Sequence, residues 1–371
     1  MDEFQRLKDQ INIHGHKPIR GVNLGGWLLA EYWMTKESPA WRGVPENRAE
    51  QGEYQAMKYL GHEKGDAQFD AHRRTFITET DFAQISAYGL NTVRIPIGYW
   101  IREAGDGEDR TWAPGGITYL DRAIREWGPK HKLFVLISIH AARGSQNGWD
   151  SSSPQEFLKT NWDKHQENID DTVALANWLA LRYNDDICFL GIGLLNEPNK
   201  VDPDKLTRYY LEAGARIREH SDMCMIGVAP LLNQQEPGGT EHWEKFMNYP
   251  KWARIRHEWH KSMIWGYENY DADEIIKLVQ TDVAQHFVKW DIDGGNWLLV
   301  SEWSLAAAVP MNEEQMRRFA KAQLAAYKKA RGGWIFWTWK FYGEDEGGTN
   351  PWSAKEMFRN GFLPRIDLDS E

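Results

Sequence analysis

The sequence is poor in several features that mark particular classes of protein. It has two cysteines, Cys188 and Cys224, in 371 residues, and no Asn-X-Ser/Thr sequon. Both cysteines lie in apolar runs, where we expect buried free thiols and no disulfide framework. No stretch of 18 or more apolar residues occurs, so we expect no membrane-spanning helix. Lysine and arginine, with 44 copies, are fewer than the 54 aspartates and glutamates. The formal net charge of −10 argues against nucleic acid or an anionic membrane as the main partner.

The first residues, MDEFQRLKDQINIHG, carry charges where a signal peptide needs an apolar core. Two locations therefore stay open: the protein remains inside the cell, or it is secreted and its signal peptide has been removed.

Tryptophan is the residue in excess, with 20 copies. Its flat apolar face and single N–H donor suit both protein cores and clefts that stack on sugars. We expect most of these side chains to be structural and about a third to line a site.

Eight short apolar runs bounded by turn residues follow one another along the chain, as buried strands do. They lie at 19–25, 90–97, 133–141, 187–198, 223–230, 254–260, 297–304 and 332–340. Segments with helical periodicity lie between them, at 76–89, 116–131, 167–185, 203–220 and 312–333. Strands that alternate with helices predict an α/β fold with a parallel sheet, and eight such units predict a (β/α)8 TIM barrel.

An open, doubly wound sheet is the alternative architecture. The glycines of RGVNLGGW, after the first strand, lack the spacing of a dinucleotide-binding turn, which argues against it. We see no repeat or linker, so we expect a single catalytic domain over residues 1–371. The long connections 31–75, 142–165 and 231–252 are expected to carry function.

Polar and aromatic residues stand where seven of the eight predicted strands end. The active site of such a barrel is built at these ends. The fifth run ends at Ala229-Pro230 and offers no polar group. The residues at the other ends are Glu31, Arg94, His140, Asn196, Glu197, His257, Trp259, Glu302 and Trp337.

Glu197 and Glu302 close the fourth and seventh runs, so their carboxyl groups could face each other across the barrel mouth. Glycoside hydrolysis needs two facing carboxyl groups, one protonated to assist the leaving oxygen and one ionised to attack the anomeric carbon. We expect Arg94 to keep Glu302 ionised. Apolar surroundings and the charge of its partner are expected to raise the pKa of Glu197.

The motifs together resemble a known family. They are RGVNLGGW, VRIPIGYW, SQNGWD, LLNEPN, SEWS, GGWIFWTWK and the late NPWS…NGF. This order is similar to glycoside hydrolase family 5 of the cellulase clan, and most closely resembles its fungal exo-β-1,3-glucanase subgroup. The likeness runs from about residue 19 to residue 365.

The resemblance implies a role for the residues near the scissile bond. Glu197, in LLNEPN, would be the general acid/base, and Glu302, in SEWS, the nucleophile of a retaining double displacement. Asn196 would donate a hydrogen bond to the sugar 2-hydroxyl, and Arg94 would orient Glu302.

It also implies substrate-binding roles for residues around this pair. His140 and His257 would bind hydroxyls or shape the surroundings of the acid, and Trp337 would be the stacking floor. Glu31 would grip the terminal glucose, and Trp149 would stand at the entrance of the cleft.

One position departs from the family pattern. The family usually has His-x-Tyr at the end of strand 6, with the Tyr hydroxyl near the nucleophile. This chain has His257-Glu258-Trp259 there, and an indole N–H can donate a hydrogen bond but cannot accept one. His260 is expected on the opposite face of the strand from His257, which argues against a metal site.

We therefore expect a monomeric retaining β-glucosidase or exo-β-glucanase that needs no metal or cofactor and acts on a β-glucan, β-glucoside or glycolipid. An endo-β-glucanase and a glucosylceramide-type β-glucosidase are the alternatives among enzymes. A non-catalytic carbohydrate-binding barrel is the alternative from another class. A metal-dependent hydrolase would need ligands at strand ends 1, 5 and 6, and strand 5 has none.

Overall fold

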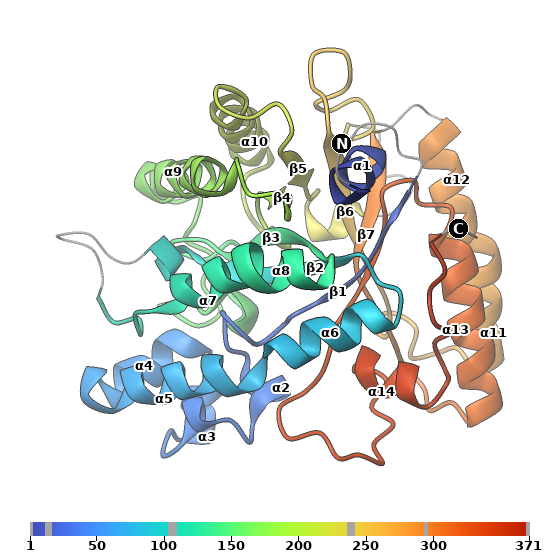
Figure 1. Ribbon diagram of the computed structural model, residues 1–371, viewed down its shortest axis with the longest axis horizontal. Coiled ribbons are helices and arrows are strands. Elements are labelled where there is room, and N and C mark those ends of the chain that lie inside the picture. The colour runs from blue at the N-terminus through green and yellow to red at the C-terminus, as the bar shows by residue number, and fades with distance from the viewer. Residues whose placement is uncertain (1–2, 12–16, 103–109, 236–241, 293–295, 369–371) are drawn as a thin grey trace.

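Eight parallel strands form a closed barrel in the computed structural model (Figure 1), which describes residues 3–11, 17–102, 110–235, 242–292 and 296–368. They pair in chain order, and β8 closes on β1. The strands are β1 (Ile19–Asn23), β2 (Thr92–Gly98), β3 (Phe134–Ala141), β4 (Phe189–Gly193), β5 (Met225–Val228), β6 (Ile255–Met263), β7 (Trp297–Ala307) and β8 (Gly333–Phe336). Each lies on one of the eight predicted runs. Closure confirms the (β/α)8 barrel and excludes the open sheet.

Helices surround the barrel (Figure 1). They are α1 (Glu3–Asp9), α2 (Tyr32–Thr35), α3 (Glu46–Ala49), α4 (Glu53–Leu60), α5 (His62–Phe76), α6 (Glu79–Ala87), α7 (Gly116–Arg122), α8 (Gly128–His131), α9 (Gln166–Tyr183), α10 (Pro203–Arg218), α11 (Ala272–Leu278), α12 (Ala284–Ile292), α13 (Glu313–Tyr327) and α14 (Ala354–Arg359). All five predicted helical segments are confirmed.

The segment 31–75, expected as a long connection, holds α2 to α5. Residues 236–241 of the expected 231–252 connection lie outside the described residues.

Side chains of each strand alternate between the barrel interior and the helical layer, as the period of two requires. On β3, Phe134 and Leu136 belong to an inner apolar cluster, whereas Val135 and Ile137 pack in the outer core. Phe4 of α1 stacks on Phe134, with ring centroids 4.4 Å apart, and so closes the N-terminal end of the barrel. Near the C-terminal ends of the strands, inward positions carry polar side chains instead.

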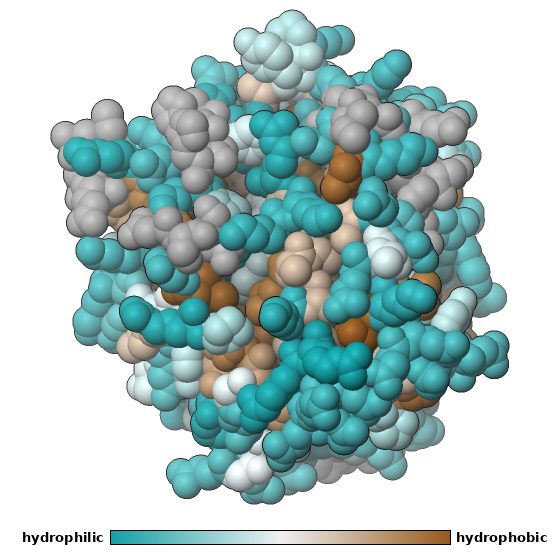
Figure 2. Space-filling model, turned by 90° about the vertical axis from the view of Figure 1, so that its right-hand side faces the viewer, coloured by the Kyte–Doolittle hydropathy of each residue, from teal (hydrophilic) through white to brown (hydrophobic). Residues whose placement is uncertain are grey.

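The outer surface over α11, α12 and α13 is largely hydrophilic, with hydrophobic side chains gathered near the middle of this face (Figure 2). Within the described part of the chain, no helix has the length and apolar character needed to cross a membrane.

Candidate active site

A cavity of about 740 Å³ opens where the strands end, and aromatic side chains dominate its walls. Six of the 20 tryptophans of the chain line it, close to the third expected for a site. The lining residues are Glu31, Trp33, His140, Trp149, Asp150, Ser151, Glu197, Leu232, His260, Lys261, Ser262, Trp265, Glu302, Trp303, Ser304, Trp337 and Trp352. Flat apolar walls with a few carboxyl groups suit a sugar, whose faces are apolar and whose edges carry hydroxyls.

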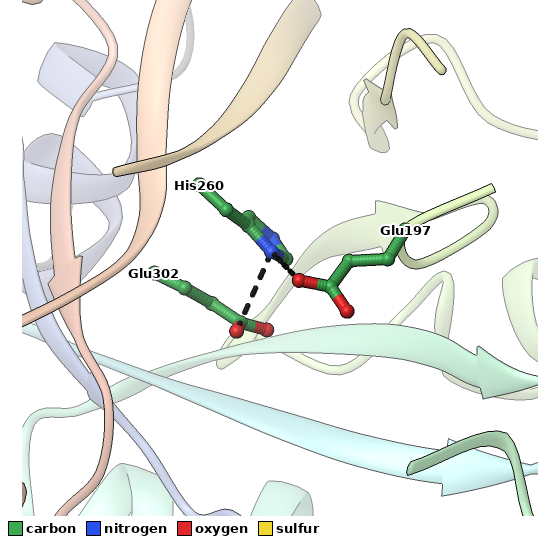
Figure 3. Close-up of side chains that lie close together, drawn as sticks. All are labelled: Glu197, His260 and Glu302. Atoms are coloured by element: carbon green, nitrogen blue, oxygen red, sulfur yellow. Dashed lines mark hydrogen bonds and ion pairs between the residues drawn. The ribbon is translucent and has the colours of Figure 1, made fainter. Parts of the chain in front are cut away.

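Glu197 and Glu302 face each other in this cavity, with His260 between them (Figure 3). Nδ1 of His260 lies 2.7 Å from Oε1 of Glu197 and 3.4 Å from Oε2 of Glu302. A carboxylate oxygen of Glu197 lies within 4.8 Å of one of Glu302. The backbone of Glu197 has φ of 46°, a left-handed conformation that costs free energy in a residue with a side chain and is typical of functional sites.

Arg94 contacts the site from below, on β2. Its Nη1 donates to Oε1 of Glu302 at 2.9 Å, and its Nη2 donates to Oδ1 of Asn196 at 2.9 Å. Nη1 also donates to Asn23 and Nη2 to Glu258. The guanidinium is buried, and these contacts fix its plane beneath the glutamates.

The ends of β3 and β4 are held together by a side chain that sequence reasoning did not single out. Nε2 of Gln146 donates to the backbone oxygens of His140 and Asn196, both at 2.8 Å. Nδ2 of Asn196 lies 3.3 Å from Nε2 of His140. Gln146 belongs to the SQNGWD motif, so the motif was visible in the sequence while the role of this residue was not.

Trp337 forms a wall of the cavity next to His140. The two rings stack with centroids 5.5 Å apart and planes inclined by 7°. A Cβ atom at Gly25 would lie 2.8 Å from the Trp337 ring, so the glycine of RGVNLGGW is needed for this close approach.

Glu31 lines the cavity beside Trp33. Its Oε2 accepts a hydrogen bond from Nε1 of Trp33 at 2.9 Å, and Trp33 packs edge-on against Trp352 and Phe341. Oε1 of Glu31 is buried without a hydrogen-bond partner in the described part of the chain. Burial, then the charge of Asp150, raises the pKa of Glu31 well above its usual value. Trp149 also lines the cavity.

His257 and Trp259 do not lie in the cavity, which corrects their expected place in the site. His257 points into the helical layer, where Nε2 lies 3.3 Å from the backbone oxygen of Phe246 and the ring packs on Trp290 of α12. Trp259 is 1% exposed and packs on Phe287 and Trp290. Burial lowers the pKa of His257 to about 4.

The inward positions at the end of β6 are Glu258 and His260. Glu258 contacts Arg94, and His260 contacts Glu197 and Glu302. The predicted inward positions on β6 were wrong by one residue. The pairing of β6 with β7 has a register irregularity between Trp259 and His260, at the same point. The argument about an indole at this place therefore does not apply, because an imidazole stands there.

Burial raises the pKa of Glu302 to about 7, against the opposing charges of His260 and Arg94. Arg94 was expected to keep this carboxyl group ionised, but the pKa of Glu302 is raised rather than lowered. Burial works to lower the pKa of His260, but the charges of Glu302 and Glu197 outweigh it and raise that pKa. Burial, together with Arg94 and His260, lowers the pKa of His140 well below its usual value.

Glu197, His260 and Glu302 are the one group of three potential ligands near enough to hold a metal ion within the described ranges. Arg94 already donates to Glu302, and a cation beside this guanidinium would meet its repulsion.

The fold is a closed eight-stranded barrel, and facing carboxyl groups lie between aromatic walls in the cavity at its strand ends. The chain matches the model of the cellulase family (glycosyl hydrolase family 5) over residues 55–343. It is 32% identical to the probable glucan 1,3-beta-glucosidase A of Emericella nidulans, over 95% of this chain and 91% of the relative. It is 27% identical to the glucan 1,3-beta-glucosidase of Candida oleophila, over 94% and 88%. The chain belongs to glycosyl hydrolase family 5 and is a glycoside hydrolase.

Solved structures agree with the fold. The crystal structure of rutinosidase from Aspergillus niger covers 94% of this chain and 98% of its own, with a TM-score of 0.79 and 15% identity. The endoglucanase Cel5A of Thermotoga maritima covers 100% and 99%, with a TM-score of 0.58 and 18% identity.

Proposed function

We propose that this enzyme is a retaining, exo-acting β-glucosidase or exo-β-1,3-glucanase that releases glucose from a β-glucan or β-glucoside. The observation that carries the proposal is the pair Glu197 and Glu302, with oxygens within 4.8 Å of each other in the cavity. Retaining glycosidases hold their two carboxyl groups about 5–5.5 Å apart, and inverting enzymes about 6.5–9.5 Å apart. The short separation supports direct attack by one carboxylate.

Glu302 would be the nucleophile and Glu197 the acid/base. In the first step a carboxylate oxygen of Glu302 bonds to the anomeric carbon, the glycosidic bond breaks, and Glu197 gives its proton to the leaving oxygen. In the second step Glu197 takes a proton from water, whose oxygen attacks the same carbon and releases Glu302. The contact of Arg94 with Glu302 supports this order, because a guanidinium favours the ionised form of the carboxyl group it touches.

Residues around the pair would bind the sugar. Asn196, held by Arg94 and next to His140, would donate to the 2-hydroxyl. Oε1 of Glu31, which is buried and has no hydrogen-bond partner among the described residues, would accept from hydroxyls of the terminal sugar. Trp337 and Trp149 would stack on sugar faces. Because all these groups belong to one chain and one barrel, we propose that a monomer with a single catalytic domain is sufficient.

The exo mode rests on the side of the cavity behind Glu31. Trp33 packs there against Trp352 and Phe341, with ring centroids 5.4 Å and 5.3 Å apart. A wall of rings behind a sugar-gripping carboxyl group favours a chain end over the middle of a polysaccharide. The names of the Emericella and Candida relatives agree with this substrate.

Hydrolysis of a panel of substrates tests the proposal: an aryl β-glucoside, laminarin, a β-1,4-glucan, mannan, an aryl rutinoside and glucosylceramide. We expect glucose as the only early product, from the aryl β-glucoside and laminarin. The first glucose released should be the β-anomer by NMR. Early oligosaccharides would mean an endo-acting enzyme, and early α-glucose would mean an inverting one. Turnover of only another substrate in the panel would contradict the proposed specificity for β-glucans and β-glucosides.

A further inference from the structure

Glu258 is a buried carboxyl group that the proposed reaction does not use. It lies on β6, is 3% exposed, and does not line the cavity. Its Oε2 accepts from Nη2 of Arg94 at 3.2 Å, and its Oε1 has no partner in the described part of the chain. A Cβ at Gly193 or Gly227 would lie 2.4 Å or 1.9 Å from Oε1. Two neighbouring strands therefore carry glycine where this carboxyl group needs room.

Arg94 consequently serves two carboxyl groups, Glu302 above and Glu258 below. The first step of the reaction needs Glu302 ionised and Glu197 protonated. With Glu258 also ionised, two negative charges would face the single positive charge of Arg94. Uncompensated buried charge is costly, so the site needs a second cation.

His260 is placed to be that cation. It stands two residues after Glu258 on the inward face of β6, and its backbone N–H donates to Oε1 of Gln235 at 2.6 Å. Its Nδ1 is within reach of both Glu197 and Glu302. The raised pKa of His260 is in keeping with a protonated ring.

Charged and titratable groups near this ring come from several strands of the barrel. They are Glu197 after β4, Glu302 on β7, Arg94 on β2, His140 on β3, and Lys261 next along β6. Lys261 directs its Nζ to the backbone oxygen of Gln235. Burial lowers the pKa of His140 well below its usual value, which favours the uncharged ring. The Nδ1–H of His260 therefore meets two carboxyl groups.

We propose that Glu258 and His260 are a charge-compensating pair of positioning residues: Glu258 draws part of the charge of Arg94 away from Glu302, and the His260 imidazolium replaces it. The inference rests on the proposed roles of Glu197 and Glu302. In the first step Glu302 loses its negative charge as the ester forms, while Glu197 gains one as it gives up its proton. A fixed cation between the two stabilises the negative charge before and after this transfer, and His260 itself gains and loses no proton.

The test is the pH dependence with which Glu302 reacts. A 2-deoxy-2-fluoro-β-glucosyl fluoride would esterify the nucleophile and release fluoride, and the modified peptide is identified by mass spectrometry. The acid limb of the inactivation rate then reports ionisation of Glu302. H260Q removes a cation and should move this limb upward by about one pH unit, whereas E258Q removes an anion and should move it downward by a similar amount.

The double variant E258Q/H260Q should return the limb to within a few tenths of a unit of wild type, because the two changes oppose each other. E53Q is the matched control: Glu53 is also buried and paired with an arginine, Arg73 at 3.3 Å, but lies outside the cavity. The acid limb of the inactivation rate of E53Q should lie at the same pH as that of wild type. If H260Q does not fold, E258Q alone tests the proposal: a downward shift of its acid limb supports the compensating pair, and no shift refutes it.

The two proposals fail in different ways. If wild-type Glu302 is not labelled, the proposed function is wrong. If Glu302 is labelled but neither variant moves the limb, or both move it in the same direction, the compensating pair is refuted and the proposed function stands.

Discussion

At the scale of single residues, the site depends on which of its carboxyl groups carries a proton. The charges of His260 and Arg94 act to lower the pKa of Glu302, but burial prevails and raises it to about 7. The sequence predicted both glutamates, which close apolar runs, and Arg94, a charged residue within one such run. It did not predict the balance of charge around them, since that balance depends on distances of 2.7 to 3.4 Å between residues far apart in the chain.

Replacement of Glu302 by Gln should lower kcat on an aryl β-glucoside by at least about 10³-fold, because an amide cannot form the glycosyl ester. Folding should persist, since the amide oxygen still accepts from Arg94. Steady-state kinetics and a thermal unfolding curve measured on the same sample check both points. Turnover near that of wild type would remove Glu302 from the role of nucleophile.

Replacement of Glu197 by Ala should give a different pattern. Substrates with a good leaving group, such as a dinitrophenyl β-glucoside, should still form the ester, because they need little help from an acid. Hydrolysis of the ester should then be slow, and added azide should speed turnover and yield the β-glucosyl azide. Chromatography and NMR of the product check this result. No effect of azide, or an α-azide, would contradict the retaining assignment.

The pH profile should reflect the raised pKa of Glu302. A nucleophile whose pKa is raised is protonated, and so inactive, below that pKa. The activity kcat/KM should therefore fall as the pH drops through a value well above 4.5, the usual value for a glutamate. Initial rates across the pH range, with enzyme stability checked at each pH, measure the limb. An acid limb at or below 4.5 would mean that Arg94 and His260 outweigh burial.

At the scale of elements, β6 separates what a pattern can predict from what it cannot. The run RIRHEWH was predicted as a strand, and it is one. The prediction of which side chains point into the barrel was wrong, because no hydrophobic alternation marks the inward positions. The inward side carries Glu258 and His260. The outward side carries His257 and Trp259. A shift of one residue exchanges the two faces of a strand. A buried carboxyl group opposite two glycines on other strands leaves no mark in the local sequence.

This correction can be tested with W259F. Trp259 packs on Phe287 and Trp290 of α12, so the smaller ring should lower the free energy of unfolding by about 1–2 kcal/mol. Denaturant unfolding measures that loss. KM for the aryl glucoside should stay within about twofold of wild type. A raised KM with unchanged stability would return Trp259 to the substrate site.

At the scale of the whole molecule, the barrel was the part that the sequence predicted best. Eight apolar runs separated by helical segments fix both strand number and strand direction, and a parallel barrel of eight follows from right-handed crossovers. The loops were predicted least well. The segment 31–75 folds into helices that support Glu31 and Trp33, and its apolar residues did not stand out beside the strands. Behind Glu31, Trp33 of this segment packs on the rings of Phe341 and Trp352, which lie some 300 residues away.

The proposed exo mode, which needs the cavity closed behind Glu31, gives the last prediction. Replacement of Trp33 by Ala removes the ring that packs on Phe341 and Trp352 and the N–H that donates to Glu31. The cavity should open behind the terminal sugar, so laminarin should yield early oligosaccharides beside glucose. KM for the aryl glucoside should rise by roughly tenfold as Glu31 loses its fixed position. Y249A is the matched control, because Tyr249 is an aromatic residue, 79% exposed, that does not line the cavity. Its early product should stay glucose alone. Glucose as the only early product of W33A as well would mean that Trp33 does not close the cavity.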